Sequence, residues 1–271
     1  MRPIPYRPII AVPFTQNAAY TELAPPPVLR PYIRCFWGTT EPVHPSDAVG
    51  LVIPDTCMDI IFEVDETQGS VIDSFCAIDE RAYHPGGKPI ARPSSTFAIR
   101  FYAWTAALFA ERPLSGSKNQ SFAARAFFPS LLKELTPILL RGASLNERAA
   151  AASVILTRRL DSLRVDPCLM NAVDGIVSAR GTRKIDDLAA LGGISRKRLE
   201  RVFNEQMGIS PKAFSALVRY QLLWQDLCFG TEPSVLDLVE KYGYFDQAHL
   251  LNDFKRHHTM TPAQALRYAR G

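Results

Sequence analysis

Residues 195–211 read SRKRLERVFNEQMGISP, and residues 246–262 repeat the same pattern as DQAHLLNDFKRHHTMTP. The matching positions are 51 residues apart: Ser195 and Asp246, Leu199 and Leu250, Phe203 and Phe254, Pro211 and Pro262. Each copy follows a short apolar helix pattern and a turn that contains glycine, and each opens with a residue that caps helices well. A helix, a tight turn and a capped second helix form a helix-turn-helix, whose second helix enters the DNA major groove. The repeat therefore predicts two DNA-reading heads in one chain.

The first copy separates apolar from charged residues. Leu199, Val202 and Phe203 recur at helical spacing, which marks the buried side of its second helix. The exposed side then holds Arg196, Lys197, Glu200, Arg201 and Asn204. Arginine and lysine match guanine, asparagine matches adenine, and glutamate accepts from cytosine. A solvated charged surface is the alternative, and the second copy downstream argues against it.

The second copy predicts a weaker reader. Its exposed candidates are Gln247, Ala248, His249, Asn252 and Arg256. Glutamine and asparagine can read adenine, and alanine can meet a thymine methyl group. His249 fits either a phosphate contact or a structural role at the helix start. Leu250 and Phe254 should pack inward, together with Leu251 or His258.

Residues 211–227 between the copies predict one long helix. Proline is tolerated in its first turn, and such a rod fixes the spacing of the two heads. Heads that read successive major-groove faces must lie roughly 34 Å apart. For Arg219 in this helix we expect an ion pair in the core.

The stretch from about 170 to 268 resembles the DNA-binding domain of AraC/XylS-type bacterial transcriptional regulators. The quoted matches are Ile185, Leu188-Ala189, Gly193-Ile194-Ser195, Leu199-Glu200-Arg201-Val202-Phe203, Gly208-Ile209-Ser210-Pro211, Arg219, Gly243-Tyr244-Phe245-Asp246-Gln247-Ala248-His249, Phe254-Lys255 and Thr261-Pro262. The resemblance implies base-facing roles for Lys197, Glu200, Arg201, Asn204, Gln247, Ala248 and Asn252. It also implies double-stranded promoter or operator DNA and RNA polymerase as partners. The chain departs from the family at His258-Thr259, where Phe-Gly is usual, and at Asn252, which is often arginine.

Composition divides the chain into two expected domains, residues 1–165 and 166–271. Seventeen of the 21 prolines precede residue 166, which favours loops and short strands there.

No apolar run approaches a membrane span of about 20 residues, and the N-terminus lacks a signal-peptide core, so we expect a cytoplasmic protein without a membrane partner. The five cysteines are scattered and predict reduced thiols. We expect no cofactor and no metal site.

The first domain is expected to be rich in strands. Candidate strands are Ile33–Thr39, Val49–Ile53, Met58–Val64, Val71–Ala77 and Thr96–Tyr102, and candidate helices are Phe128–Leu140 and Leu145–Leu163. The fold class is therefore α+β. A barrel-like, β-rich domain with helices precedes an all-α domain in which a long helix joins two helix-turn-helix motifs.

Strands followed by two helices resemble the cupin-like regulatory domains of the same family. More narrowly, three segments resemble an AraC-associated N-terminal domain type of poorly defined ligand: Pro31–Trp37, Ile53–Phe62 and Phe97–Phe101. The resemblance implies a small-molecule effector, and a small barrel can hold a ligand among inward side chains. The candidate pocket residues are Trp37, Phe62, Arg100 and Trp104; ordinary core packing is the alternative for each. Residues 145–163 are also expected to pair with their counterpart in a homodimer; a helix packed on the barrel of its own chain is the alternative.

Two other functions compete with that of an effector-controlled regulator. The N-terminal domain could lack a ligand and only dimerise or contact polymerase. The chain could also be an enzyme or DNA-repair fusion, but it has no H-x-H, G-x-S-x-G or nucleotide-loop motif. A repair-type methyl acceptor needs an activated thiol, and the aspartates on either side of Cys57 should raise its pKa. We therefore expect a regulator and no enzyme.

Overall fold

The computed structural model describes residues 4–14, 20–39, 50–84, 94–141, 144–231 and 234–270. Its described strands form one antiparallel sheet of six strands in the order β1-β2-β5-β3-β4-β6. They are β1 (Thr21–Leu23), β2 (Ile33–Gly38), β3 (Cys57–Asp65), β4 (Ser70–Cys76), β5 (Ser95–Tyr102) and β6 (Ser121–Phe122). The three central strands β2, β5 and β3 place β-branched and aromatic residues on a buried surface, as strand propensity favours.

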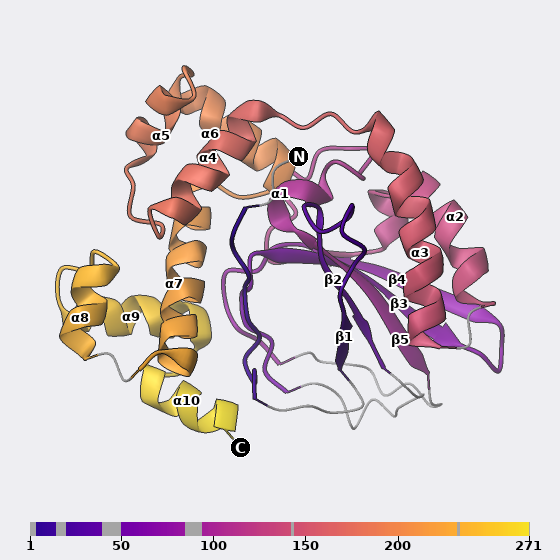
Figure 1. Ribbon diagram of the computed structural model, residues 1–271, viewed down its shortest axis with the longest axis horizontal. Helices are drawn as coiled ribbons and strands as arrows, with labels where there is room; N and C mark the ends of the chain where they lie inside the picture. The colour runs from indigo at the N-terminus through magenta and orange to yellow at the C-terminus, as the bar shows by residue number, and fades with distance from the viewer. Residues whose placement is uncertain are drawn as a thin grey trace.

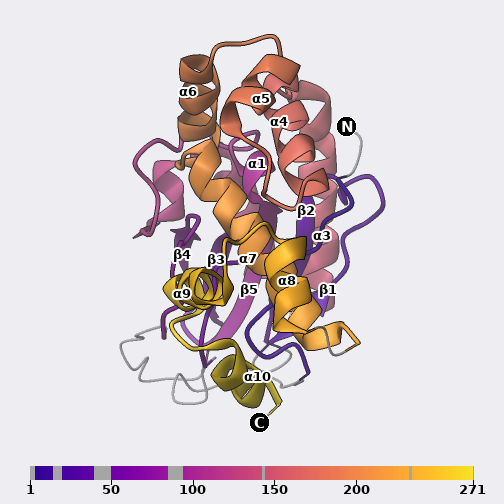
Figure 2. The same cartoon turned by 90° about the vertical axis from the view of Figure 1, so that its left-hand side faces the viewer.

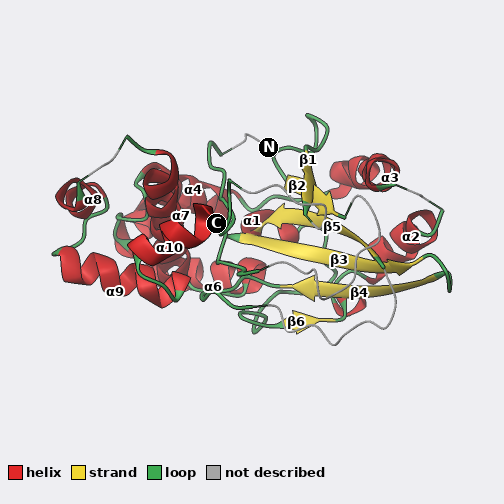
Figure 3. Ribbon diagram, turned by 90° about the horizontal axis from the view of Figure 1, so that it is seen from below, coloured by secondary structure: helices red, strands yellow, loops and turns green. Residues whose placement is uncertain are grey.

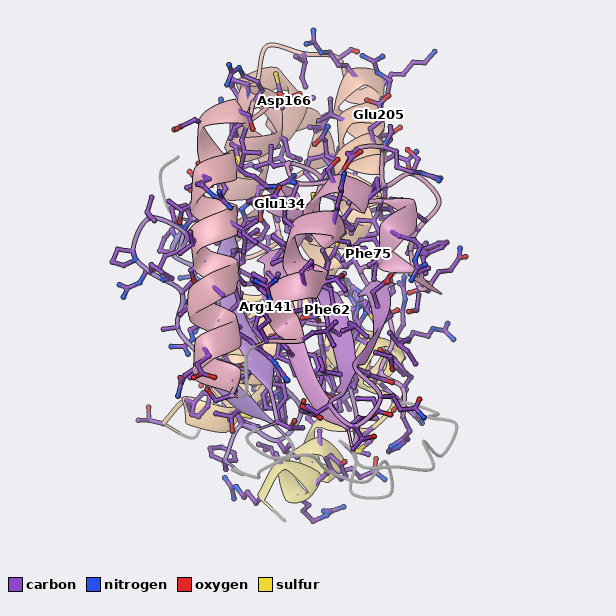
Figure 4. All side chains as sticks on the ribbon, turned by 90° about the vertical axis from the view of Figure 1, so that its right-hand side faces the viewer. Phe62, Phe75, Glu134, Arg141, Asp166 and Glu205 are labelled. Atoms are coloured by element: carbon purple, nitrogen blue, oxygen red, sulfur yellow. The ribbon has the colours of Figure 1, made fainter. Side chains whose placement is uncertain are left out.

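One face of the sheet is apolar. Met58, Ile60, Phe62 and Val64 alternate along β3 and are fully buried. Two helices lie on this side, α2 (Pro129–Leu139) and α3 (Leu145–Arg159). Figure 4 shows both helices in front of the strands that carry Phe62 and Phe75.

The other face is polar and charged. Arg100 of β5 pairs in register with Asp59 of β3, and its Nε donates to Asp59 Oδ1 at 2.9 Å. Trp37 Nε1 of β2 donates to the same oxygen at 2.8 Å. Buried charges need such partners, so these polar residues hold three neighbouring strands together.

The remaining helices form the C-terminal part of the chain. They are α4 (Pro167–Ser178), α5 (Ile185–Leu191), α6 (Arg196–Met207), α7 (Pro211–Phe229), α8 (Val235–Lys241), α9 (Gln247–His258) and α10 (Pro262–Arg270). Figures 1 and 3 show the sheet between α2 and α3 on one side and these helices on the other. The short helix α1 (Ala103–Ala106) follows β5 directly and packs against α6. The expected α+β architecture with a long central helix is confirmed.

The hydrophobic core does not divide at residue 165. One cluster of buried residues runs from the sheet, for example Ile60, to Phe203 of α6 and Phe214 of α7. A second cluster joins Phe254 of α9 to Leu51 and other residues of the N-terminal part. Both halves of the helical domain are therefore packed against the first domain.

Several expected elements differ in detail. Residues 50–53 form no strand, and Val52 makes only an isolated bridge with Tyr83; Val49 lies outside the described residues. Pro54 ends the stretch, and proline cannot donate to a ladder. The expected helix 145–163 ends at Arg159 and continues as a 3-10 turn, Leu160–Ser162. Strands β1 and β6 were not expected, because two or three residues carry no readable alternation.

Candidate nucleic-acid interface

The first helix-turn-helix consists of α5, the Gly192-Gly193 turn and α6. Gly193 has a φ of 62°, a left-handed conformation that glycine adopts without strain. Ser195 caps α6, since its hydroxyl accepts a hydrogen bond from the Arg198 backbone N–H at 3.2 Å. Leu199 and Phe203 are fully buried, so the opposite side of α6 is free to face a partner.

That exposed side carries all five residues expected there: Arg196, Lys197, Glu200, Arg201 and Asn204. Arg196 is engaged within the protein, because its guanidinium lies 3.0 Å from Glu200 and 3.5 Å from Asp186. Lys197 and Arg201 have no ion-pair partner among the described residues. Of the α6 candidates, these two are the cations most available to an anionic partner.

The second helix-turn-helix consists of α8, a turn at Gly243 and α9. Gly243 has a φ of 62°, and the Asp246 carboxylate accepts from the His249 backbone N–H at 2.7 Å. Leu250, Phe254 and His258 are buried and Leu251 is half-buried, which confirms the inward side. The expected outward residues are all exposed: Gln247, Ala248, His249, Asn252 and Arg256.

His249 has a structural contact at the start of α9. Its Nδ1 accepts a hydrogen bond from the Phe245 backbone N–H at 3.3 Å, and its ring lies edge-on to Tyr244 at 5.1 Å. An accepting Nδ1 places the proton of the neutral ring on Nε2. His249 thus fixes the turn through one nitrogen and presents the other as a donor.

Arg219 of α7 forms the expected ion pair with the second head. Its guanidinium lies 2.8 Å from Asp253 of α9 and 4.6 Å from the centre of the Tyr244 ring. The Tyr244 hydroxyl donates to the same carboxylate at 3.0 Å. These contacts tie the central helix to both the turn and the recognition helix of the second head.

Two buried histidines end α9. His258 Nδ1 and the Tyr220 hydroxyl are 2.8 Å apart, and burial lowers the pKa of His258 to about 4. His257 Nδ1 lies 2.7 Å from the Glu80 carbonyl of the first domain, and burial lowers its pKa as well. The family's usual phenylalanine is thus replaced by a neutral, hydrogen-bonded ring.

The first domain contacts both heads. The Leu114 N–H donates to the Glu205 carbonyl in α6 at 2.8 Å, and the Ala82 N–H donates to the His257 carbonyl in α9 at 2.7 Å. Between them Gln221 of α7 exchanges hydrogen bonds with the Ile9 backbone at 2.9 and 3.1 Å. The helical domain is therefore hydrogen-bonded along its length to residues 4–14 and to the loops around residues 82 and 114.

The two recognition helices, α6 and α9, are not parallel. Figure 2 shows α9 nearly end-on while α6 is seen from the side. Two helices that enter successive major grooves on one face of straight DNA must be similarly inclined. In this structure α6 and α9 are not similarly inclined, so they do not meet that requirement.

The candidate effector residues lie in three places. Trp37 and Arg100 meet on the polar sheet face, with the guanidinium carbon 5.6 Å from the indole centre. Phe62 lies on the opposite face in the core, and Trp104 packs against Phe214 of α7 with ring centres 6.0 Å apart. Arg100 is already paired with Asp59 and Asp55.

The surroundings of Cys57 bear on the expected reactivity of its thiol. Cys57 is buried, and burial, followed by the nearby Asp55 charge, raises the pKa of its thiol. The expected direction is correct, but burial is the larger cause. Within the described ranges no three His, Cys, Asp or Glu side chains gather to hold a metal ion, and no described helix is long and apolar enough to cross a membrane.

The chain is similar to known proteins in both parts. Residues 188–268 match the model of a helix-turn-helix domain, and residues 21–123 match that of a domain of unknown function, DUF6597. A helix-turn-helix-type transcriptional regulator of Haemophilus influenzae is 34% identical over 84 residues, which are 30% of this chain and 26% of that protein. The regulator MtrA of Neisseria gonorrhoeae is 28% identical over 178 residues, 65% of this chain and 53% of MtrA. The chain thus matches about a quarter and about half of the length of these relatives.

Solved structures give looser similarities. A Chromobacterium violaceum regulator with an AraC-type DNA-binding domain is 25% identical, with a TM-score of 0.36 over 38% of this chain and 92% of the other. ToxT from Vibrio cholerae is 10% identical, with a TM-score of 0.40 over 86% of this chain and 97% of the other. The helix-turn-helix match over residues 188–268 and the capped repeat within it support an AraC-type transcriptional regulator.

Proposed function

We propose that the protein is a transcriptional regulator that binds double-stranded DNA through both heads. One observation carries the proposal: two capped helices stand 51 residues apart, each buries its apolar side, and each exposes its polar side. Phosphate contacts supply much of the affinity and base contacts supply the specificity. The relatives that match the chain are named as transcriptional regulators.

The first head is proposed to give most of the base discrimination. Arg201 and Lys197 reach guanine, Asn204 pairs with adenine, and Glu200 accepts from cytosine. Arg196 must first exchange its ion pair with Glu200 for a phosphate or base. In the second head Gln247 and Asn252 read adenine, and Ala248 meets a thymine methyl group. Arg256 and His249 Nε2 are placed to donate to phosphates.

We further propose that the first domain controls DNA binding. Its contacts with Glu205, Gln221 and His257 hold α6 and α9 in non-parallel positions. DNA binding then requires the heads to reorient, and a ligand shifts that equilibrium only if it binds the two arrangements with different affinity. The proposed effector is a small molecule at the sheet face around Trp37 and Arg100. RNA polymerase and a second copy of the chain are the other proposed partners.

The first experiment is selection of bound sequences from random DNA, followed by titration of the selected site. Arg201→Ala should weaken binding and relax one base position, by about 1–3 kcal/mol. Arg141→Ala is the matched control, because Arg141 is exposed just after the end of α2 (Figure 4), and α2 lies on the opposite side of the sheet from both heads (Figure 1). Equal loss on all sequences would make Arg201 a phosphate contact, and equal behaviour of both variants would contradict the proposed interface.

Effector control is tested separately by thermal unfolding with a library of small molecules. A ligand that binds only the native state raises Tm, and the stabilisation grows with the logarithm of its concentration once this exceeds Kd. The effector hypothesis predicts a compound that raises Tm and changes DNA affinity. A compound that raises Tm without changing DNA affinity, or the absence of any binder, favours the regulator without a ligand.

A further inference from the structure

Phe245 is the most exposed large hydrophobic residue among those the structure describes, with 90% of its surface accessible. Its neighbours along the turn are buried: Tyr244 is 6% and Tyr242 is 1% exposed. The turn therefore has a core within reach, yet this ring points away from it. Single exposed apolar residues are common, so exposure by itself assigns no role.

The backbone that carries this ring is fixed. The Phe245 N–H donates to His249 Nδ1 at 3.3 Å, and the next residue, Asp246, caps α9. The Tyr244 hydroxyl is bonded to Asp253 on the preceding side. These contacts thus hold the backbone of Phe245 directly before the N-cap of α9, close in sequence to Gln247 and Ala248.

The exposed positive charges of α9 complement the negative phosphates of a nucleic acid. Lys255 and Arg256 are both exposed, and neither has a carboxylate within ion-pair distance among the described residues. The residues of a recognition helix that reach base edges are those of its N-terminal end. Phe245 lies at this end, directly before the cap.

We infer that Phe245 is a specificity-determining residue of the second head that packs its ring against a thymine 5-methyl group in the major groove. The inference rests on the proposed DNA-binding function and adds a residue and a base to it. A phenyl ring can neither donate nor accept a hydrogen bond, and the thymine methyl is the apolar group that the major groove presents. With Gln247 and Ala248 beside it, the ring makes the second head a reader of A·T pairs.

The test replaces thymine by deoxyuridine, which lacks only the 5-methyl group. The wild-type full-length chain first selects its site, and each thymine of the second half-site is then replaced in turn. One replacement should weaken wild-type binding about three- to fivefold, the amount expected for one buried methyl group. Phe245→Ser should bind the thymine site with a similar loss and should no longer distinguish thymine from deoxyuridine at that one position, whereas any thymine contacted by Ala248 should remain distinguished.

Ile72→Ser is the matched control, because Ile72 is 65% exposed in β4 of the other domain. Its affinity and its sensitivity to deoxyuridine should equal those of the wild type. Thermal unfolding of both variants checks that they fold. Wild-type binding that is indifferent to every replacement, or a Phe245→Ser variant that keeps the thymine preference at every position where the wild type has it, would overturn the inference while leaving the DNA-binding function intact. A chain that selects no sequence would overturn both.

Discussion

Gly208 and Thr259 end the two recognition helices with the same left-handed backbone, with φ of 71° and 67°. In both, the backbone N–H of this residue donates to a carbonyl of the last helical turn. The two positions are equivalent in the repeat, but only the first carries the residue that suits this conformation. A side chain with a Cβ in the left-handed region costs about 1–2 kcal/mol.

Thr259→Gly should therefore stabilise the protein. Relief of the strain exceeds the extra freedom of glycine in the unfolded chain, for a net gain of about 0.5–1 kcal/mol and a rise in Tm of about 1–4 °C. The reciprocal change Gly208→Ala should destabilise it, because a Cβ there would lie 2.6 Å from Ser117 Oγ. A lower Tm for Thr259→Gly would show that the threonine makes a compensating contact.

Removal of one partner of the Arg219–Asp253 pair should cost more than removal of both. The two side chains are 18% and 9% exposed, so Arg219→Met leaves a largely buried carboxylate without its cation and lowers the free energy of unfolding by about 3 kcal/mol. Addition of Asp253→Leu should restore most of the loss. Urea titration of both single variants and the double variant gives the coupling, and additive losses would mean that the pair contributes nothing.

His258 should make the protein less stable in acid. Its pKa is about 4 when folded and about 6.5 when unfolded, so the unfolded chain binds more protons between these values. The free energy of unfolding should fall as the pH drops from 7 to 4, by about 3 kcal/mol for this residue. His258→Phe should remove that part of the pH dependence, and the difference from wild type cancels the contributions of other groups. Parallel stability curves for the two proteins would contradict this assignment.

Loosening the N-terminal segment should favour DNA binding. Gln221→Ala removes the hydrogen bonds of a fully buried side chain to Ile9 and to the Pro54 carbonyl. If the docked arrangement restrains the heads, DNA affinity should rise about two- to tenfold, the range of one or more lost hydrogen bonds. Gln225→Ala is the control, since it loses only an exposed bond to the Arg7 carbonyl and should change affinity less. Weaker binding by Gln221→Ala would show that docking supports the DNA-competent state.

The helical domain was largely predictable because its information is local. Caps at Ser195 and Asp246, glycine turns and helical spacing specify each head without reference to the rest of the chain. Even the Arg219 ion pair follows from a charged residue within an apolar stripe. The sequence showed Thr259 as a departure from the usual glycine. Its left-handed backbone explains why glycine is usual there, since glycine adopts that conformation without strain.

The sheet and the docking of the domains were less predictable. Strand pairing is non-local, so nothing in residues 50–53 shows that they lack a neighbouring strand. The four candidate pocket residues share an aromatic or cationic character, but register places Trp37 and Phe62 on opposite faces. Gln221 and residues 4–14 carry no motif, because their contacts depend on a surface more than 160 residues away in the sequence. The sequence did offer one sign of Phe245, because an apolar residue directly before the cap of α9 does not belong to the apolar spacing of that helix.

Selection of bound genomic fragments by the full-length protein at near-physiological salt shows whether one chain reads one DNA site with both heads. We expect a single motif with two half-boxes about ten base pairs apart, in which the half-box contacted by Arg201 contains guanine and the other is rich in A·T pairs. Salt-sensitive binding without a motif, or a motif with one half-box that survives replacement of all exposed α9 residues, would contradict it.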